Sequence, residues 1–219
     1  METYKQLGEL LRYIKHHQDG EVVSKMNASG IVYNMNYGLS LYLLMQKAKQ
    51  IGRNHELALL LRKEAFREAQ LLYFMIEEPS YIDAVEMEKI VNDFTNYELA
   101  EIACLHLFPY CENAIDKIKH WTKSGNEYVR MSGFTLLGRL IMKRPDLEKD
   151  KIQDILYIFD VLPENGSLFE KRSICFALSV IAKFGLKNEV EVINNLLGQN
   201  NSAVAQFVYK NMIEELKYV

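Results

Sequence analysis

The sequence predicts an all-α fold in which helix pairs stack as a solenoid. Predicted helix starts recur every 31 to 40 residues, near Glu64, Thr95, Asn126, Gly166 and Asn201, and this is the period of helical repeats. Hydrophobic residues make up 49% of the chain, whereas glycine and proline number only 11 and 4, which is typical of an ordered, helix-rich protein. Stacked helix pairs leave an extended surface that usually binds another chain or a nucleic acid.

The first part of the chain is predicted to form short helices separated by polar breaks. Ser29–Gly38 is rich in Asn, Tyr and Gly and is expected to be a loop. Gly52 suits a left-handed helix cap, and Asn54 can cap the helix after it. Helices are expected over Glu2–His17, Glu21–Asn27, Ser40–Ile51, Asn54–Leu61, Glu64–Glu77 and Asp83–Asn92. One apolar helix face is predicted from Ala65, Ala69, Leu72 and Ile76.

The second part of the chain continues the same pattern. Thr95 is expected to cap a helix in a capping box with Glu98, and Pro109, Pro145 and Pro163 are expected to end helices. Helices are expected over Thr95–Phe108, Cys111–Trp121, Asn126–Met142, Glu148–Leu162, Leu168–Phe184, Lys187–Leu197 and from Asn201 to the C-terminus. No linker rich in Pro, Ser or Gly divides the chain, so residues 1–219 are predicted to form a single HEAT-like repeat domain.

Charge, cysteine content and apolar runs indicate which compartment and which partners to expect for this protein. The formal net charge is −3, from 26 basic and 29 acidic residues, so a nucleic-acid site would need its positive charge gathered on one face. Cys104, Cys111 and Cys175 are odd in number and show no paired spacing, which argues against a disulfide framework. The N-terminus lacks a signal pattern, and apolar runs such as Leu71–Ile76 are far too short to cross a membrane. We therefore expect a cytoplasmic protein.

The sequence contains no standard cofactor or metal motif, so neither is expected. It has no phosphate-cradling Gly-rich loop, no dinucleotide fingerprint and no His-Glu-x-x-His or Cys-x-x-Cys motif. Cys104, His106 and Cys111 lie close in sequence, but core cysteines beside a hydrogen-bonded histidine are favoured over a zinc site. His16 and His17 are interpreted as a solvated helix end.

Two predicted helix faces carry unusual side chains. Tyr97 and Glu101 are four residues apart and share a face; on pattern alone, a solvent-facing acid beside a packed ring is the favoured interpretation. Phe176 points about 200° away from the core position Ile174. Its own face is shared by Phe169, Arg172, Ser179 and Lys183. Rings interleaved with cations are typical of a nucleic-acid groove, and the equally weighted alternative is that the two Phe rings pack on the next repeat.

These segments resemble the DNA alkylation repair family of HEAT-repeat DNA glycosylases. The resemblance runs from about Met26 to Lys183. It is carried by Asn36-Tyr37-Gly38-Leu39-Ser40, Lys47-Ala48-Lys49-Gln50-Ile51-Gly52, His55-Glu56-Leu57-Ala58, Arg67-Glu68-Ala69-Gln70-Leu71-Leu72, Glu77-Glu78-Pro79, Asp93-Phe94-Thr95-Asn96-Tyr97-Glu98 and Trp121-Thr122-Lys123-Ser124. The order and spacing of these short motifs make the resemblance specific.

The resemblance implies a curved all-helical stack that binds duplex DNA in a concave basic groove. Family members remove cationic alkylated purines, such as 3- or 7-alkyl adducts, without a snug base-flipping pocket. An Asp stabilises the oxocarbenium-like sugar and positions water, two Trp rings contact the sugar and backbone, and an Arg holds the backbone. A cationic base is already a good leaving group, so a carboxylate near the sugar can supply much of the catalysis.

This chain departs from the family at all four of these positions. Tyr97 and Glu101 stand where the family has Trp and Asp, and Phe176 stands at the second Trp. Met131 occupies the Arg position, with Arg130 one residue earlier and about 100° around the helix. By resemblance, Glu101 is the expected catalytic carboxylate of an alkylpurine DNA glycosylase. The expected DNA-binding residues are Tyr97, Arg130, Met131, Phe169, Arg172, Phe176 and Lys183.

Two further hypotheses follow from these departures. The loss of the arginine at Met131 is consistent with a protein of the same fold that binds double-stranded DNA without glycosylase activity. The acidic net charge is consistent with a HEAT-like scaffold that binds a protein partner and no nucleic acid.

Overall fold

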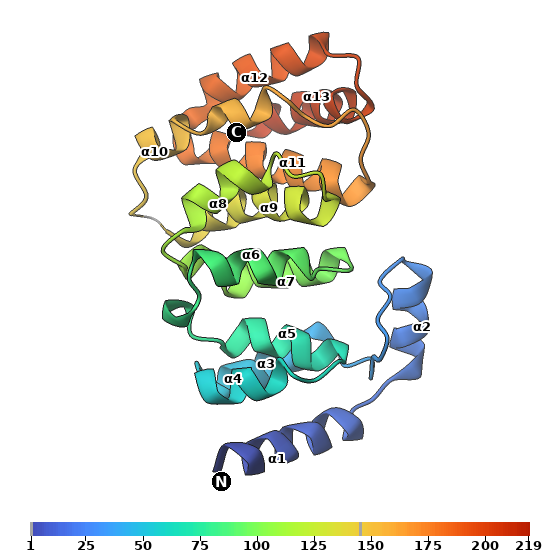
Figure 1. Cartoon of the computed structure of the whole chain (residues 1–219). Helices are drawn as coiled ribbons and strands as arrows, with labels where there is room; N and C mark the ends of the chain where they lie inside the picture. The colour runs from blue at the N-terminus through green and yellow to red at the C-terminus, as the bar shows by residue number, and fades with distance from the viewer. Residues whose placement is uncertain (1, 145) are drawn as a thin grey trace. The chain divides into compact units, whose positions relative to one another are not determined.

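The chain folds into helices joined by turns and loops (Figure 1). The computed structural model describes residues 2–144 and 146–219, and these residues contain no strand, which confirms the all-α prediction. Pro145, which is predicted to end a helix, lies outside the described residues. The helices cluster into two compact units, Met1–Asp83 with Thr95–Cys111 and Ala84–Phe94 with Glu112–Val219. A single domain over residues 1–219 stays a prediction.

The first unit is built around α5, whose side chains are almost all buried. Helix α5 packs against α3, α4 and α7, and α4 also packs against α1. The helices of this unit are α1 (Glu2–His16), α2 (Gly20–Ala28), α3 (Leu41–Ile51), α4 (His55–Leu61), α5 (Arg67–Ile76) and α7 (Tyr97–His106), with 3₁₀ turns at Pro79–Tyr81 and Phe108–Tyr110. The predicted caps are confirmed, because Asn54 accepts the backbone N–H of Leu57 at 3.0 Å and Gly52 has φ 73°.

Helix α5 begins three residues later than the prediction from Glu64. The backbone N–H groups of Lys63 and Glu64 donate into the last turn of α4, so these residues close α4 and do not open α5. Ala65 consequently lies before the helix and is exposed. The other predicted apolar positions, Ala69, Leu72 and Ile76, are fully buried.

The predicted capping box at the start of α7 is wrong. Asn96, and not Thr95, caps the helix, and its side chain accepts the N–H groups of Glu98 at 3.0 Å and Leu99 at 3.3 Å. The Glu98 carboxylate pairs with Arg67 on α5 and does not reach back to the cap. A residue 31 positions away in sequence thus decides the role of Glu98.

The second unit is built around α9, which packs against α6, α8 and α11. Helix α13 packs against both α11 and α12, so α9, α11 and α13 follow one another as a row of helices with α11 in the middle (Figure 1). The helices of this unit are α6 (Ala84–Asn92), α8 (Ala114–Trp121), α9 (Glu127–Lys143), α10 (Lys149–Gln153), α11 (Leu168–Ile181), α12 (Lys187–Gln199) and α13 (Ala203–Glu215).

Three predicted helix ends in the second unit differ from the structure. The helix predicted over Glu148–Leu162 is divided into α10 and a 3₁₀ turn, Leu156–Phe159. Helix α11 gives way after Ile181 to a π turn, Ala182–Leu186. Helix α12 continues through Gly198 to Gln199. The ring of Tyr209 packs on Gly198, where an added Cβ would lie 2.8 Å from it. Gly198 therefore permits a close approach and does not end the helix.

The cysteines and histidines do not form a metal site within residues 2–144 and 146–219. Cys104 and Cys111 are buried, Cys175 is half-buried, and all three are free thiols. No group of three or more His, Cys, Asp or Glu side chains in these ranges is placed to hold a metal ion. In the same ranges, no helix combines the length and apolar character that a membrane crossing requires.

Candidate nucleic-acid interface

The predicted site residues divide between the two units. Tyr97 and Glu101 belong to α7 of the first unit. The second unit holds the others, Arg130 and Met131 on α9, Phe169, Arg172 and Phe176 on α11, and Lys183 in the π turn after α11. Different helices therefore position the two sets of residues.

Helix α7 presents Tyr97 and Glu101 one turn apart. Tyr97 is the first residue of the helix and is half-buried, whereas Glu101 is exposed. Burial raises the pKa of the Tyr97 hydroxyl, and the charges of Glu98 and Glu101 raise it further. The phenol therefore stays protonated beside the carboxylate.

A buried ionic network holds the first turn of α7 in place. Arg67 donates from Nε and Nη2 to the two oxygens of Glu98, at 2.8 and 2.6 Å, and the Tyr33 hydroxyl donates to Glu98 at 2.7 Å. Burial, and after it the charge of Glu98, hold the pKa of Tyr33 far above its usual range. The helix turn that carries Tyr97 is consequently fixed to α5 and to the Ser29–Gly38 loop.

Arg130 and Met131 on α9 face the protein. Arg130 donates to both oxygens of the fully buried Glu170 on α11, at 2.6 and 3.2 Å. Its Nη1 also donates to the backbone carbonyls of Ser124 and Gly125, at 2.9 and 3.0 Å. Met131 is 4% exposed, because α9 packs against three helices. The guanidinium of Arg130 thus joins α11 to the loop before α9, and the Met131 side chain lies in the core.

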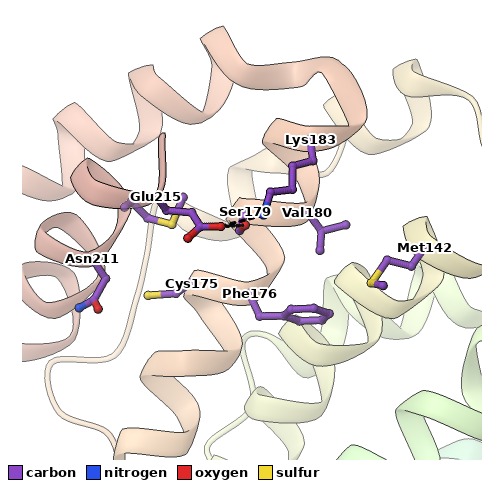
Figure 2. Close-up of a pocket in the computed structure, with 9 residues that line it drawn as sticks. Met142, Cys175, Phe176, Ser179, Val180, Lys183, Asn211 and Glu215 are labelled. Atoms are coloured by element: carbon purple, nitrogen blue, oxygen red, sulfur yellow. Dashed lines mark hydrogen bonds and ion pairs between the residues drawn. The ribbon is translucent and has the colours of Figure 1, made fainter. Parts of the chain in front are cut away.

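Phe176 lies on the outer face of α11, as the helical period predicts. Ile174 is fully buried, whereas Phe176 is half-buried. Its ring reaches toward α9 (Figure 2), where it covers the backbone of Gly138 and lies 4.9 Å from the guanidinium carbon of Arg139. A cation held over an aromatic face is attracted by the ring quadrupole. The ring therefore packs on the preceding helix of the row.

Basic side chains accompany this ring along the two helices. Arg172 is exposed one turn before Phe176, and Lys183 is exposed two turns after it. Lys143 is exposed on α9, one turn after Arg139. We name this set, Arg139, Lys143, Arg172, Phe176 and Lys183, the α9–α11 stripe.

A cavity of about 560 Å³ opens beside the Phe176 ring, between α11 and α13. Figure 2 shows Glu215 reaching from α13 toward α11, where its Oε1 accepts from Ser179 at 2.7 Å and from Lys183 at 2.8 Å. The hydrogen bonds from Lys183 and Ser179 lower the pKa of Glu215. Burial raises the pKa of the Cys175 thiol to about 11, so the one cysteine that lines the cavity is neutral at physiological pH. The remaining lining residues are Met142, Val180, Asn211 and Met212.

The family model for DNA alkylation repair enzymes matches residues 10–214. The chain belongs to the DNA alkylation repair family. Its fold is similar to a solved structure from a new family of proteins related to the HEAT-like repeat DNA glycosylases with affinity for branched DNA structures. That similarity has a TM-score of 0.75 at 18% sequence identity and covers 97% of this chain and 98% of the other. The predicted HEAT-like fold is thereby confirmed. No curated protein matches the chain.

In this member of the DNA alkylation repair family, sequence patterns missed the residues that surround Phe176. Gly138 and Arg139 come from α9, and Asn211 and Glu215 come from α13. A glycine followed by arginine inside a helix is a weak signal, and nothing local links α13 to α11. Glu170 was also missed as the partner of Arg130, since the two lie 40 residues apart.

Proposed function

We propose that this protein binds DNA through the α9–α11 stripe. The observation that carries the proposal is the Phe176 ring, held against Gly138 and Arg139 on a face that also presents Arg172 and Lys183. Membership of the DNA alkylation repair family supports a DNA substrate. The similar fold of a protein family with affinity for branched DNA supports double-stranded DNA with branches as one form to test.

The chemistry of the stripe suits a sugar–phosphate backbone. Cations that neutralise phosphates release counterions, which makes the affinity strongly salt-dependent. An aromatic ring adds stacking or sugar contacts that tolerate any sequence. Because the net charge of the chain is −3, binding is expected to depend on this local stripe and not on a long-range field.

The first test is the affinity of the protein for a linear duplex and a four-way junction at low salt, by fluorescence anisotropy. We expect Phe176→Leu to weaken binding by about tenfold, since one aromatic contact is worth about 1–3 kcal/mol. The matched control is Tyr157→Leu, because the Tyr157 ring also lies near a cation, 4.7 Å from Nζ of Lys123, but outside the stripe. Absence of DNA binding by the unaltered protein would contradict the proposal and favour a protein partner.

A second candidate function is the release of cationic alkylated purines, such as 3- or 7-alkyl adducts. The observation that favours it is the exposed Glu101, one turn after Tyr97 on a helix start that Arg67 and Glu98 hold in place. A carboxylate in a fixed position can stabilise the oxocarbenium-like sugar and orient water.

The test of this activity uses a duplex with one 7-methylguanine or 3-methyladenine and measures the released base. Glu101→Gln is expected to abolish release while leaving DNA affinity similar or higher. Release that is unchanged in this variant would remove Glu101 from the mechanism. Binding without any release would leave a DNA-binding protein that has lost the glycosylase reaction.

A further inference from the structure

We propose that the cavity between α11 and α13 binds one unstacked nucleobase that carries an exocyclic amine. This inference rests on the proposed DNA binding and adds a specific subsite to it. The family resemblance implies no base pocket, so the subsite would distinguish this chain from the family pattern.

The size and walls of the cavity suit a flat, mostly apolar ligand. Its volume of about 560 Å³ lies within the usual range for ligand pockets, roughly 300–1,000 Å³. Met142, Val180 and Met212 supply apolar walls, and the ring of Phe176 supplies an aromatic surface. Bases that leave the helical stack are bound by proteins on such aromatic and apolar surfaces.

The polar end of the cavity offers hydrogen-bond acceptors. Both donors to Glu215, Ser179 and Lys183, bind its Oε1, and Oε2 accepts no hydrogen bond from the residues that the structure describes. Asn211 donates its Nδ2 to the carbonyl of Phe207 at 2.8 Å, which leaves its Oδ1 as an acceptor. Asn211 and Glu215 are one turn apart on α13 and both line the cavity.

These acceptors select among the bases. Adenine, cytosine and guanine each carry an exocyclic amine whose two N–H groups can donate to both acceptors, whereas thymine has no exocyclic amine and donates only from its single ring N3–H. Lys183 pairs with Glu215 and offsets part of its negative charge. A neutral base in the cavity would therefore not lie against an isolated carboxylate. The exposed Arg172 and Lys183 lie on the same face as the cavity lining and can hold the flanking phosphates.

Cys175 provides a direct probe in the unaltered protein. It lines the cavity (Figure 2) and is the one cysteine that is not buried. Because the thiolate is the reactive form, the rate of N-ethylmaleimide labelling of the folded protein is compared at one fixed pH, where it reports the accessibility of Cys175. At equal saturation with DNA, a duplex with a single bulged adenine is expected to slow this labelling more than the fully paired duplex does. A duplex with a bulged thymine is expected to give less protection than the adenine.

Two variants separate the cavity from the stripe. Val180→Trp fills the cavity without changing any charge, so it is expected to remove a preference of about tenfold for the bulged adenine while the affinity for paired duplex stays within about twofold. Its matched control is Val192→Trp, because Val192 is 60% exposed on α12, outside the cavity. Asn211→Leu is expected to reduce the discrimination of adenine from thymine.

The outcomes distinguish the two proposals. Binding of paired and bulged DNA with equal protection of Cys175 would overturn the base pocket and leave the DNA-binding proposal intact. Failure to bind either DNA would contradict the DNA-binding proposal and the pocket with it. Circular dichroism of Val180→Trp checks that its loss of preference does not come from unfolding, and if that variant does not fold, the labelling of the unaltered protein decides alone.

Discussion

The first turns of α7 and α11 are held by the same kind of arginine–glutamate pair, one in each unit. Arg67 on α5 binds both oxygens of Glu98, and Arg130 on α9 binds both oxygens of Glu170. Each pair joins two helices that pack against each other within one unit, α5 with α7 and α9 with α11.

The two pairs differ in what surrounds the arginine. Arg67 also meets the fully buried Glu68 at 3.3 Å, so two carboxylates depend on one guanidinium. Although burial opposes its charge, Glu98 and then Glu68 raise the pKa of Arg67. Arg130 meets a single carboxylate, and burial raises the pKa of Glu170 against the opposing effect of Arg130. The loss of Arg67 is therefore expected to destabilise the fold more than the loss of Arg130 does.

The largest expected effect is the loss of Arg67. Arg67→Leu leaves the carboxylates of Glu68 and Glu98 without their cation in a buried site, and breaking such a pair costs about 3–5 kcal/mol. Urea denaturation at pH 7 measures the free energy of unfolding. The control is Lys63→Leu, four residues earlier at an exposed position. A loss below about 1 kcal/mol would show that the network is not a main support of the first unit.

Arg130→Leu is expected to cost less, about 3 kcal/mol at pH 7, because Glu170 can take up a proton. Burial already raises the pKa of Glu170, and the loss of Arg130 removes the interaction that opposes this rise. The folded variant therefore takes up a proton at a higher pH than the unaltered protein does, so its relative stability improves as the pH falls. The difference in free energy of unfolding between the unaltered protein and the variant should therefore become smaller between pH 7 and pH 5. Arg144→Leu, at a surface pair with Asp146, is the control.

The Arg130→Leu variant also tests the phosphate contact that the resemblance implies. If Arg130 supports the fold alone, DNA affinity should fall only in step with the folded fraction. Two results would contradict a purely structural role of Arg130. One is a loss of stability that grows as the pH falls, and the other is a large loss of DNA affinity at unchanged stability.

Gly138→Ala is expected to have a smaller effect, about 1–3 kcal/mol. The added Cβ would overlap the ring of Phe176, so either the ring moves or the packing of α9 against α11 is strained. Thermal unfolding measures the cost, and DNA affinity should also fall because the ring is displaced. Gly125→Ala is the matched control, since nothing lies within 4 Å of a Cβ there. Equal effects of the two substitutions would count against a fixed Phe176 ring.

Lys183→Gln is expected to change stability least, by less than about 1 kcal/mol, because its pair with Glu215 is exposed. The control is Lys151→Gln, whose pair with Glu148 is similarly exposed. Both variants should unfold at nearly the same temperature, but only Lys183→Gln should weaken DNA binding. Equal DNA affinity of the two variants would remove Lys183 from the interface.

Local sequence signals explain what could be predicted. The caps at Gly52 and Asn54 and the outward face of Phe176 depend on neighbouring residues and on the helical period, and all are present in the structure. The sequence favours Thr95 as the cap of α7 because Glu98 follows three residues later, but in the structure Glu98 pairs with Arg67 on α5 and Asn96 caps the helix.

The parts of the site that sequence did not predict depend on contacts between distant segments. The burial of Met131 follows from the three helices that surround α9. The cavity needs α13 beside α11, and the position of the Phe176 ring needs a glycine on α9. Neither of these contacts between distant segments produces a periodic or regularly spaced pattern in the sequence.

The most direct test of DNA binding by the α9–α11 stripe is the salt dependence of DNA affinity in Arg172→Gln. Arg172 is exposed on the stripe, whereas the control, Lys119→Gln, changes a cation on α8 that pairs with Asp116. With one phosphate contact removed, the negative slope of log K against log salt should decrease in magnitude by about 0.9 for Arg172→Gln and stay unchanged for Lys119→Gln. Equal slopes for the unaltered protein and both variants would contradict the assignment of the stripe as the DNA interface.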